Sequence, residues 1–503
     1  MEKSGICYNN RRMAAMITVQ KEDQKVPVME AQIIIKEVDI MYKEKLDAYI
    51  DAHKEEMLED LKTLVRIDSQ RGEAQPGKPF GEGPAKVLDT AEEMMKKYGF
   101  STKNYDHYVV TADFSDQEKK LDILAHLDVV PVTKNWKETE PFEPVIKDGK
   151  IYGRGTADDK GPAIAALYAM RAVKECGVPL KNSIRLILGS DEECGSGDLA
   201  YYYAKEKEAP MTFTPDADFP VINLEKGRLQ KEFSVKLDAG SEGVAVVKVQ
   251  GGTKVNVVPD TAIAVVRGMK KAEAEKYVAE MSGHITYLLE ESTEGIEITA
   301  KGLAAHASTP EAGHNAICGL VSLLAALPLD TGSECWKVIA EMFPNDDFYG
   351  EALKVNMEDE ISGKLTMNLG ILNYDGSEVC GVFDSRIPVC GSDETVTTVL
   401  DQTFTEKGFT IEEGKMIAPH YVPADSELVQ KLLASYEAYS GIKGEPQSTG
   451  GGTYVHDLER GVAFGCMVPE VDNHMHGDDE FMVIDMLLMS AKIFADAIVR
   501  ICG

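Results

Sequence analysis

The chain has 503 residues, of which 44% are hydrophobic and 27% charged, so it can bury more than one core. Acidic residues outnumber basic residues by 84 to 53, and the formal net charge of −31 argues against nucleic acid or a membrane surface as a partner. Nine scattered cysteines without a C-x-x-C pair, and no apolar run near the ~18 residues of a membrane span, favour a cytoplasmic protein with reduced thiols.

The first part of the chain differs from the rest. Residues 1–40 begin with charged residues and lack the apolar segment of a secretory signal. We expect the folded protein to begin near Met41 and residues 1–40 to be a non-essential or disordered leader. Apolar positions at helical spacing then predict a helix over residues 42–65, followed by a Gly/Pro-rich loop at 74–84 and a helix near 85–97.

Helices and strands alternate through the next segment. Strand-like runs at 108–114, 124–131 and from 183 flank an Ala-rich helix over 161–176, which indicates an α/β sheet with some parallel strands. After Lys226 the pattern becomes α+β, with strand-like runs between 229 and 269 and a helix-like stretch over 270–291. A helical pattern resumes at 424–441. These changes predict a two-part α/β domain, 41–228 and 420–503, interrupted by an insert over 229–419 with room for two α+β modules.

Acids and histidines gather in five short segments of the first and last parts of the chain. "LAHLDVVP" ends an apolar run with His126 and Asp128, which share one face of a strand. Each segment alone is usually a solvated loop or a hydrogen-bonded pair, and "GRGTADDKG" lacks the spacing of a phosphate-binding loop. The other segments contribute Asp158 and Asp159, Glu192 and Glu193, Asp216 and Asp218, and His474, His476, Asp478, Asp479 and Glu480.

Together these segments favour a metal site. Three of them follow or flank apolar strands, where an open α/β sheet gathers its ligand-binding loops. Imidazole and carboxylate without cysteine suit zinc or another divalent transition metal. Two metals at close range need a bridging carboxylate, and a neighbouring carboxylate must accept the proton of the attacking water.

The order of the motifs resembles a known family. H-x-D, G-R-G-x-x-D-D-K-G, D-E-E-x-G, P-D and H-x-x-[DN]-E are similar to the dinuclear zinc aminopeptidase/carboxypeptidase family, which includes carnosinase, aminoacylase and succinyl-diaminopimelate desuccinylase. The long insert, "TPDADFP" and "GGGTYVH" most resemble its PepV-like dipeptidases. The resemblance covers about residues 41–503. It implies an α/β, phosphorylase/hydrolase-like catalytic domain with a central mixed sheet, and an inserted α+β lid domain that binds substrate.

The resemblance also implies the metal ligands. His126, Asp158 and Asp216 would hold one zinc ion, and Asp158, Glu193 and His476 the other, with Asp158 as the bridge. His476 is preferred over His474 because it lies four residues before Glu480. Mn²⁺ or Co²⁺ are the expected substitutes for the two Zn²⁺ ions.

Catalytic and substrate-binding residues follow from the same resemblance. Glu192 would be the general base that deprotonates the metal-bridging water, and Asp128 would accept a hydrogen bond from the His126 ring. The peptide between Asp158 and Asp159 is expected to be cis. His306 would stabilise the oxyanion in the lid. Substrate contacts are implied for Asn256, Arg386, Gly450, Gly451 and Gly452, with Arg386 and the glycines near the substrate carboxylate.

These expectations amount to a zinc-dependent, cytoplasmic dipeptidase that hydrolyses unblocked dipeptides and acts as a monomer. One alternative keeps the same two metals in an N-acetyl or N-succinyl amino acid deacylase. Another is a metal-binding protein that recognises small peptides without cleaving them, although Glu192 and all the metal positions are present.

Overall fold

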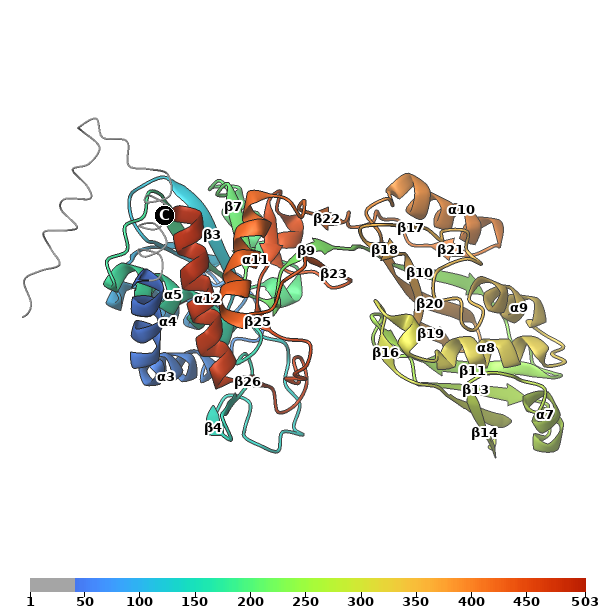
Figure 1. Ribbon diagram of the computed structural model, residues 1–503. Helices are drawn as coiled ribbons and strands as arrows, with labels where there is room; N and C mark the ends of the chain where they lie inside the picture. Colours follow the sequence, from blue (N-terminus) through green and yellow to red (C-terminus); the bar gives the residue numbers. More distant parts are fainter. Residues whose placement is uncertain (1–40) are drawn as a thin grey trace, which may run out of the picture.

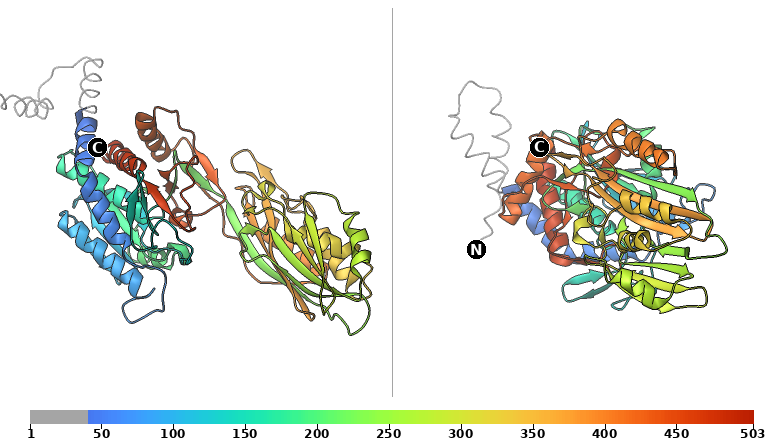
Figure 2. Two further views of the ribbon diagram at one scale, coloured as in Figure 1. Left: turned by 90° about the horizontal axis from the view of Figure 1, so that it is seen from below. Right: turned by 90° about the vertical axis from the view of Figure 1, so that its right-hand side faces the viewer.

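The computed structural model describes residues 41–503, so the expectation for the leader lies outside the described residues. Two large sheets lie in different halves of an elongated molecule (Figures 1 and 2). We call residues 41–226 and 420–503 the split half, and residues 227–419 the inserted half. Each half has its own large hydrophobic cluster.

The split half contains a mixed sheet, which confirms the predicted α/β class. Within residues 41–503, its strand order is β1-β2-β6-β3-β7-β24-β9-β22, and β23 also pairs with β9. Strands β6, β3, β7 and β24 run parallel to one another, while β1 and β2 are antiparallel additions at one edge. The strands are β1 (Ser101–Tyr105), β2 (Val109–Asp113), β3 (Lys119–His126), β6 (Ser183–Gly189), β7 (Met211–Thr214), β9 (Ile222–Glu225), β22 (His420–Tyr421), β23 (Gln447–Thr449) and β24 (Gly461–Ala463).

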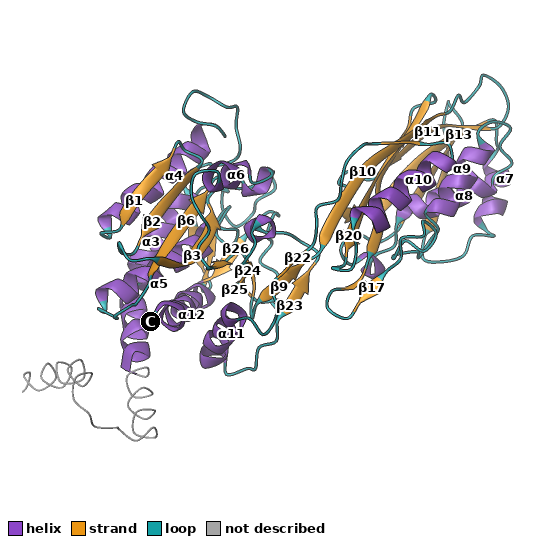
Figure 3. Cartoon of the chain, turned by 90° about the horizontal axis from the view of Figure 1, so that it is seen from above, coloured by secondary structure: helices purple, strands orange, loops and turns teal. Residues whose placement is uncertain are grey.

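Helices cover both faces of this sheet, as Figure 3 shows. Alternation explains the two faces, because successive strand side chains point to opposite sides. In β3, Ile123 and Ala125 join the cluster under the long helices, whereas Leu124 joins the cluster with Tyr454 on the other face. The helices are α3 (Lys54–Val65), α4 (Glu82–Lys97), α5 (Lys160–Glu175), α6 (Gly197–Tyr203), α11 (Glu427–Ser440) and α12 (Ile484–Cys502), with short turns η2 (Glu192–Cys194) and η5 (Tyr454–Asp457).

The inserted half is built on one continuous antiparallel sheet of the order β14-β15-β13-β11-β19-β20-β10-β21. The sequence left room for two α+β modules in this segment. Its long strands form a single sheet, and its buried apolar side chains form a single large hydrophobic cluster. Its strands are β10 (Gly227–Lys236), β11 (Ala245–Gly251), β13 (Thr261–Arg267), β14 (Thr286–Glu291), β15 (Ile296–Lys301), β19 (Thr366–Tyr374), β20 (Glu378–Ile387) and β21 (Thr410–Ile411). Its helices are α7 (Lys271–Val278), α8 (Ala316–Ala326), α9 (Ser333–Met342) and α10 (Thr398–Glu406), and its short turns η3 (Pro310–Ala312) and η4 (Asp393–Thr397).

Short strands complete the fold. β12 (Val257–Val258) pairs with β16 (Ala305–His306) at one end of the inserted half. The remaining short strands are β4 (Val145–Lys147), β5 (Lys150–Tyr152), β8 (Ala217–Asp218), β17 (Glu358–Asp359), β18 (Gly363–Lys364), β25 (Cys466–Met467) and β26 (Phe481–Val483). Across the described part of the chain, no helix is both long and apolar enough to cross a bilayer.

Two helix predictions were wrong in extent. The predicted helix over 42–65 is interrupted at His53. A first helical segment covers residues 41–52, and α3 begins at Lys54. The helix-like stretch 270–291 divides into α7 and the edge strand β14. Gly283 lies between them with a φ of 109°, and β14 pairs with β15 along its whole length. Tertiary pairing of the Thr-Tyr-Leu-Leu run therefore overrides its helical spacing.

A buried ion pair in the split half gives a test of the fold. Arg185 donates to both carboxylate oxygens of Asp122, at 2.9 and 2.7 Å, and Asp122 is fully buried. Arg185→Met should lower the free energy of unfolding by about 3–5 kcal/mol, because it strands a buried carboxylate. Urea denaturation measures the change. The partly exposed pair Lys119–Asp113 supplies the control, since Lys119→Met should cost less than about 1 kcal/mol; equal effects would contradict the assignment.

Candidate metal centre

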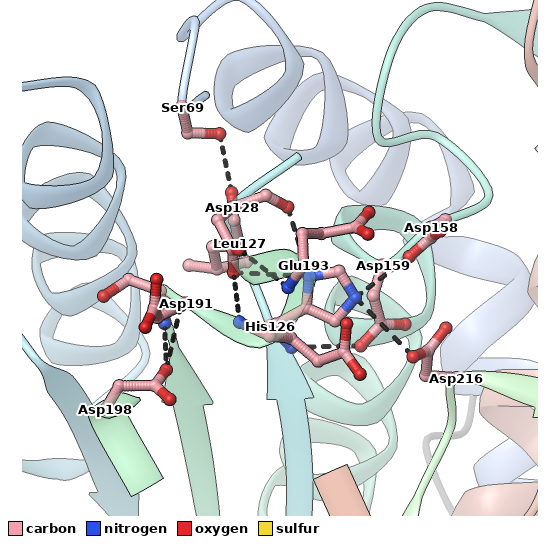
Figure 4. Close-up of polar contacts among 12 residues, drawn as sticks. Ser69, His126, Leu127, Asp128, Asp158, Asp159, Asp191, Glu193, Asp198 and Asp216 are labelled. Carbon is pink, nitrogen blue, oxygen red and sulfur yellow. Dashed lines mark hydrogen bonds and ion pairs between the residues drawn. The ribbon is translucent and has the colours of Figure 1, made fainter. Parts of the chain in front are cut away.

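Parallel strands bring the candidate ligands to one edge of the split-half sheet. His126 is the last residue of β3 and lies opposite Gly189, the last residue of β6. Glu193 follows β6 in η2, and Asp216 follows β7. The carboxyl ends of β3, β6 and β7 meet at this edge, which is where open α/β sheets carry their ligand sites. Figure 4 shows these side chains pointing toward one another.

Asp158 lies at the centre of the group, in the turn that precedes α5. Its Oδ1 is 2.9 Å from Nε2 of His126, and its Oδ2 is 2.8 Å from Nε2 of His476. Asp216 Oδ2 lies 3.6 Å from the same atom of His126, and Glu193 Oε2 lies 3.4 Å from that of His476. Each oxygen of Asp158 thus faces one histidine, and each histidine has one further carboxylate beside it.

The site holds more negative than positive charge. Burial and the charge of Asp158 raise the pKa of Glu193 and Asp216, and burial raises the pKa of Glu192 well above its usual range. Burial also opposes ionisation of Asp158, but the two histidines lower its pKa below the ordinary value. Hydrogen bonds to Asp158 and Glu193 raise the pKa of His476 to about 10. A bound cation would relieve this excess of carboxylates.

The donor atoms fit a divalent transition metal. Among the described residues, His126 Nε2 and Glu193 Oε1 are buried without a hydrogen bond of normal geometry. In each of two groups of side chains, the possible ligand atoms lie within 4.8 Å of one another. The groups are His126, Asp158 and Glu193, and His126, Asp159 and Asp216. Neutral imidazole with carboxylate oxygen, and no thiolate, is a donor set that zinc accepts. The residues present therefore fit a metal.

Asp159 was named by the sequence but given no role there. Its Oδ2 accepts a hydrogen bond of 3.1 Å from the backbone N–H of His126, and its Oδ1 is buried without a hydrogen-bond partner among residues 41–503. Burial raises the pKa of Asp159 well above the usual range. The peptide between Asp158 and Asp159 is cis, which confirms that prediction. The doubled acid in "ADDKG" was the available signal for Asp159.

Asp128 supports two elements of the site. Its backbone oxygen lies 3.1 Å from Nδ1 of His126, in hydrogen-bond contact, and its carboxylate Oδ1 lies 3.5 Å from that nitrogen. The carboxylate also accepts the backbone N–H groups of Glu192 and Glu193 at 3.2 and 3.1 Å. The residue therefore contacts the His126 ring, as the resemblance implied, chiefly through its backbone, while its side chain orients the loop of the two glutamates.

Glu480 holds the loop that carries Asp158. It is fully buried, and its carboxylate accepts from Arg154 Nη1 at 2.5 Å. The backbone N–H groups of Gly155, Ala157 and Asp158 donate to it at 3.0, 2.9 and 3.3 Å. The sequence used Glu480 only as a spacing marker for His476. Its position four residues after that histidine links the loop of Asp158 to the loop of the second histidine.

The structure distinguishes the two histidines near the C-terminus. His476 contacts Asp158 and Glu193, as given above, whereas His474 packs its ring edge-on against Phe481 with centroids 5.7 Å apart. The preference for His476 therefore agrees with the geometry.

The expected substrate contacts of the inserted half gather around the glycine turn, which we define as residues 450–452. Arg386 is buried; its Nη1 donates to the backbone oxygen of Gly450, and its Nε and Nη2 donate to Asp384 at 2.6 and 3.1 Å. Ser308, which hydrogen-bonds His306 at 2.6 Å, packs against Gly450 so closely that a Cβ on this glycine would lie 2.3 Å from the serine Cβ.

His306 and Asn256 lie side by side. β16 ends with His306, which pairs with Val257 of β12, directly after Asn256. Partial desolvation and the charge of Arg386 lower the pKa of His306, which favours the neutral imidazole. Throughout residues 41–503, no hydrogen bond or ion pair joins His306, Asn256 or Arg386 to the group around Asp158.

Comparison with known proteins gives the class. Residues 123–500 match the family described as "Peptidase family M20/M25/M40". "Putative dipeptidase YtjP" of Bacillus subtilis (strain 168) is 36% identical over 455 residues, which are 88% of this chain and 97% of the relative. "Putative dipeptidase MW1694" of Staphylococcus aureus (strain MW2) is 32% identical over 478 residues, 92% of this chain and 99% of the relative.

A solved structure shares the fold. Human carnosine dipeptidase 1 aligns with a TM-score of 0.57 and 16% sequence identity over 91% of this chain and 98% of that one. The chain therefore belongs to the M20/M25/M40 peptidase family and is a metallopeptidase, which confirms the family that the motifs resembled.

Glu480 provides the test of this centre. Glu480→Ala should weaken metal affinity by about 10- to 100-fold, because the backbone around Asp158 loses the acceptor that holds it. Competition with a chromogenic chelator measures the affinity. Glu459→Ala is the control, since the Glu459 side chain is 76% exposed and far less constrained. An unchanged affinity in a folded Glu480→Ala protein would show that Glu480 does not support the metal site.

Proposed function

We propose that the protein is a zinc-dependent dipeptidase that hydrolyses the peptide bond of unblocked dipeptides. The observation that carries the proposal is the position of Asp158, with one carboxylate oxygen at each histidine and a further acid beside each. The names of the bacterial relatives support the dipeptidase activity. We also propose that the enzyme is cytoplasmic, acts as a monomer on small peptides, and uses neither nucleic acid nor a membrane.

The two metal positions follow the contacts. His126, Asp158 and Asp216 would hold one Zn²⁺, and Asp158, Glu193 and His476 the other, with Mn²⁺ or Co²⁺ as substitutes. When bound, such a pair polarises the scissile carbonyl and lowers the pKa of the attacking water. The positions of Asp216 and Glu193 on either side of Asp158 support this arrangement. Each cation would have one of these carboxylates to itself and would share Asp158 with the other cation.

Glu192 is the proposed general base. It lies next to the ligand Glu193, and its backbone N–H is fixed by the Asp128 carboxylate. Its raised pKa suits a carboxylate that takes a proton from the attacking water and returns it to the leaving amine. The second role follows from the first, because the proton that Glu192 accepts from the water stays beside the leaving nitrogen, which is a stronger base than the carboxylate once the peptide bond breaks.

The inserted half would supply the remaining contacts as a lid. Arg386 and the glycine turn already meet, so the guanidinium and the turn's N–H groups would bind the substrate carboxylate there, with Asn256 beside them. His306, whose lowered pKa favours the neutral imidazole, would donate to the oxyanion. Since no hydrogen bond or ion pair within residues 41–503 joins it to the group around Asp158, the lid must approach the split half for this role.

Substituting the two adjacent glutamates separates the base from the ligand. Glu192→Gln should lower kcat by about 10²- to 10⁴-fold and leave the metal content unchanged, because only the proton acceptor is lost. Glu193→Gln should instead lower the metal content. Stopped-flow or endpoint dipeptide hydrolysis and elemental analysis of the same samples measure both. Turnover of Glu192→Gln at the wild-type rate would remove Glu192 from the mechanism.

A substrate panel separates the dipeptidase from a deacylase. Unblocked dipeptides should be cleaved with a kcat/KM at least about tenfold above that of N-acetyl or N-succinyl amino acids with the same C-terminal residue. An unblocked dipeptide presents a charged free amine that the carboxylates not held by metal can pair with, whereas an N-acetyl or N-succinyl amino acid has no such amine. Release of the common C-terminal amino acid is measured. Faster cleavage of the acylated compounds would favour the deacylase.

A further inference from the structure

The chain passes between the split half and the inserted half twice, and β23 lies beside the outward crossing. The outward crossing runs from β9, which ends at Glu225, into β10, and the return crossing reaches β22 at His420. β23, which leads into the glycine turn, runs parallel to β9 and places Thr449 opposite Glu225. Glu225 therefore lies where the crossings and the glycine turn meet.

The carboxylate of Glu225 is buried, with 1% of the residue exposed. Oε1 accepts from the Thr453 hydroxyl at 2.8 Å, and Oε2 accepts from the Thr453 backbone N–H at 3.2 Å. Nδ1 of His456 lies 2.9 Å from Oε2. A Cβ placed on Gly452 would lie 3.6 Å from both Glu225 Oε2 and His456 Nδ1, so the last glycine of the turn packs directly on this pair.

His456 joins this carboxylate to the return crossing. Its Nε2 lies 2.8 Å from the backbone oxygen of Ala418, so both ring nitrogens face acceptors. A ring that donates from both nitrogens is an imidazolium. The other titratable groups nearby are Asp457, which favours the cation, and His420, whose ring centroid is 6.3 Å away and whose Nε2 bonds the backbone oxygen of Gly461. Burial opposes the charge, but Glu225 outweighs it and raises the pKa of His456.

The positive charge of His456 matters because the glycine turn packs directly on the His456–Glu225 pair. An ionised Glu225 without a counter-ion would repel any carboxylate that binds at the glycine turn, while an imidazolium cancels that repulsion at short range. Thr453 and the Ala418 contact fix the turn's geometry relative to the return crossing. The pair therefore controls both the electrostatics and the position of the turn.

We propose that His456 and Glu225 are positioning residues that prepare the glycine turn for the terminal carboxylate of the substrate. The inference rests on the proposed function, because it assumes that a dipeptide places its carboxylate at this turn. His456 acts through the turn rather than on the reacting bond, so its loss falls on the KM of substrates with a free carboxylate.

The test compares a dipeptide with its C-terminal amide in the full-length metal-loaded enzyme. His456→Gln leaves Glu225 unpaired and should raise KM for the free dipeptide by about tenfold or more, with a much smaller change for the amide. Glu225→Gln/His456→Gln removes both charges and should recover most of the loss. His420→Gln, the same change in the neighbouring histidine, should leave the ratio of the two KM values unchanged.

The pH profile of the wild-type enzyme gives a second measurement that needs no variant. His456 has a pKa above the ordinary imidazole value of about 6.5, so it stays charged below that pH and loses the proton as the pH rises through its higher pKa in the folded protein. The ratio of KM for the free dipeptide to KM for the amide should rise over that range, and the rise should be absent in His456→Gln and in the double variant.

Each outcome has a defined meaning. Equal KM changes for the free dipeptide and the amide in His456→Gln, or a wild-type ratio that does not vary with pH, would overturn the inference. If His456→Gln does not fold, the inference is tested by the ratio of the two KM values in the double variant and by its pH dependence in the wild-type enzyme. A wild-type enzyme that cleaves no dipeptide at all would instead contradict the proposed function, which separates the two failures.

Discussion

The site depends on one carboxylate shared between two imidazoles. Asp158 meets His126 with one oxygen and His476 with the other, although these histidines lie 350 positions apart in the chain. Glu193 and Asp216 lie beside the two histidines in the same poorly solvated space, where burial and the charge of Asp158 raise the pKa of both, and a bound cation would favour their ionised forms. The parallel strands and the buried Glu480 keep Asp158 in this place.

The candidate ligands could be picked out from the sequence because each lies in a short motif of the family that the chain resembles. His126 ends an apolar strand, Glu193 follows another, and the strand–helix alternation places both at the same sheet edge. The four-residue spacing to Glu480 then favoured His476 over His474. The α/β class followed from the same alternation, since parallel strands need helical crossovers between them.

Other features could not be predicted, because they depend on partners distant in the chain. The stretch 286–291 has helical spacing but becomes β14, since β15 offers it an open edge. Arg386 was expected to contact the substrate carboxylate, but the sequence does not reveal that its guanidinium also contacts Asp384 and Gly450, the latter 64 residues away. Glu225 carries no motif, and only the fold shows that its carboxylate lies under the glycine turn.

Hydrogen bonds join the segment after the glycine turn to the loop that carries Glu192. The glycine turn leads into Tyr454, whose hydroxyl bonds the buried Asp198, and Asp198 accepts the backbone N–H groups of Ser190 and Asp191 at 2.6 and 3.0 Å. Those residues lead directly into Glu192. A chain of hydrogen bonds within the split half therefore joins the segment after the glycine turn to the loop of the proposed base.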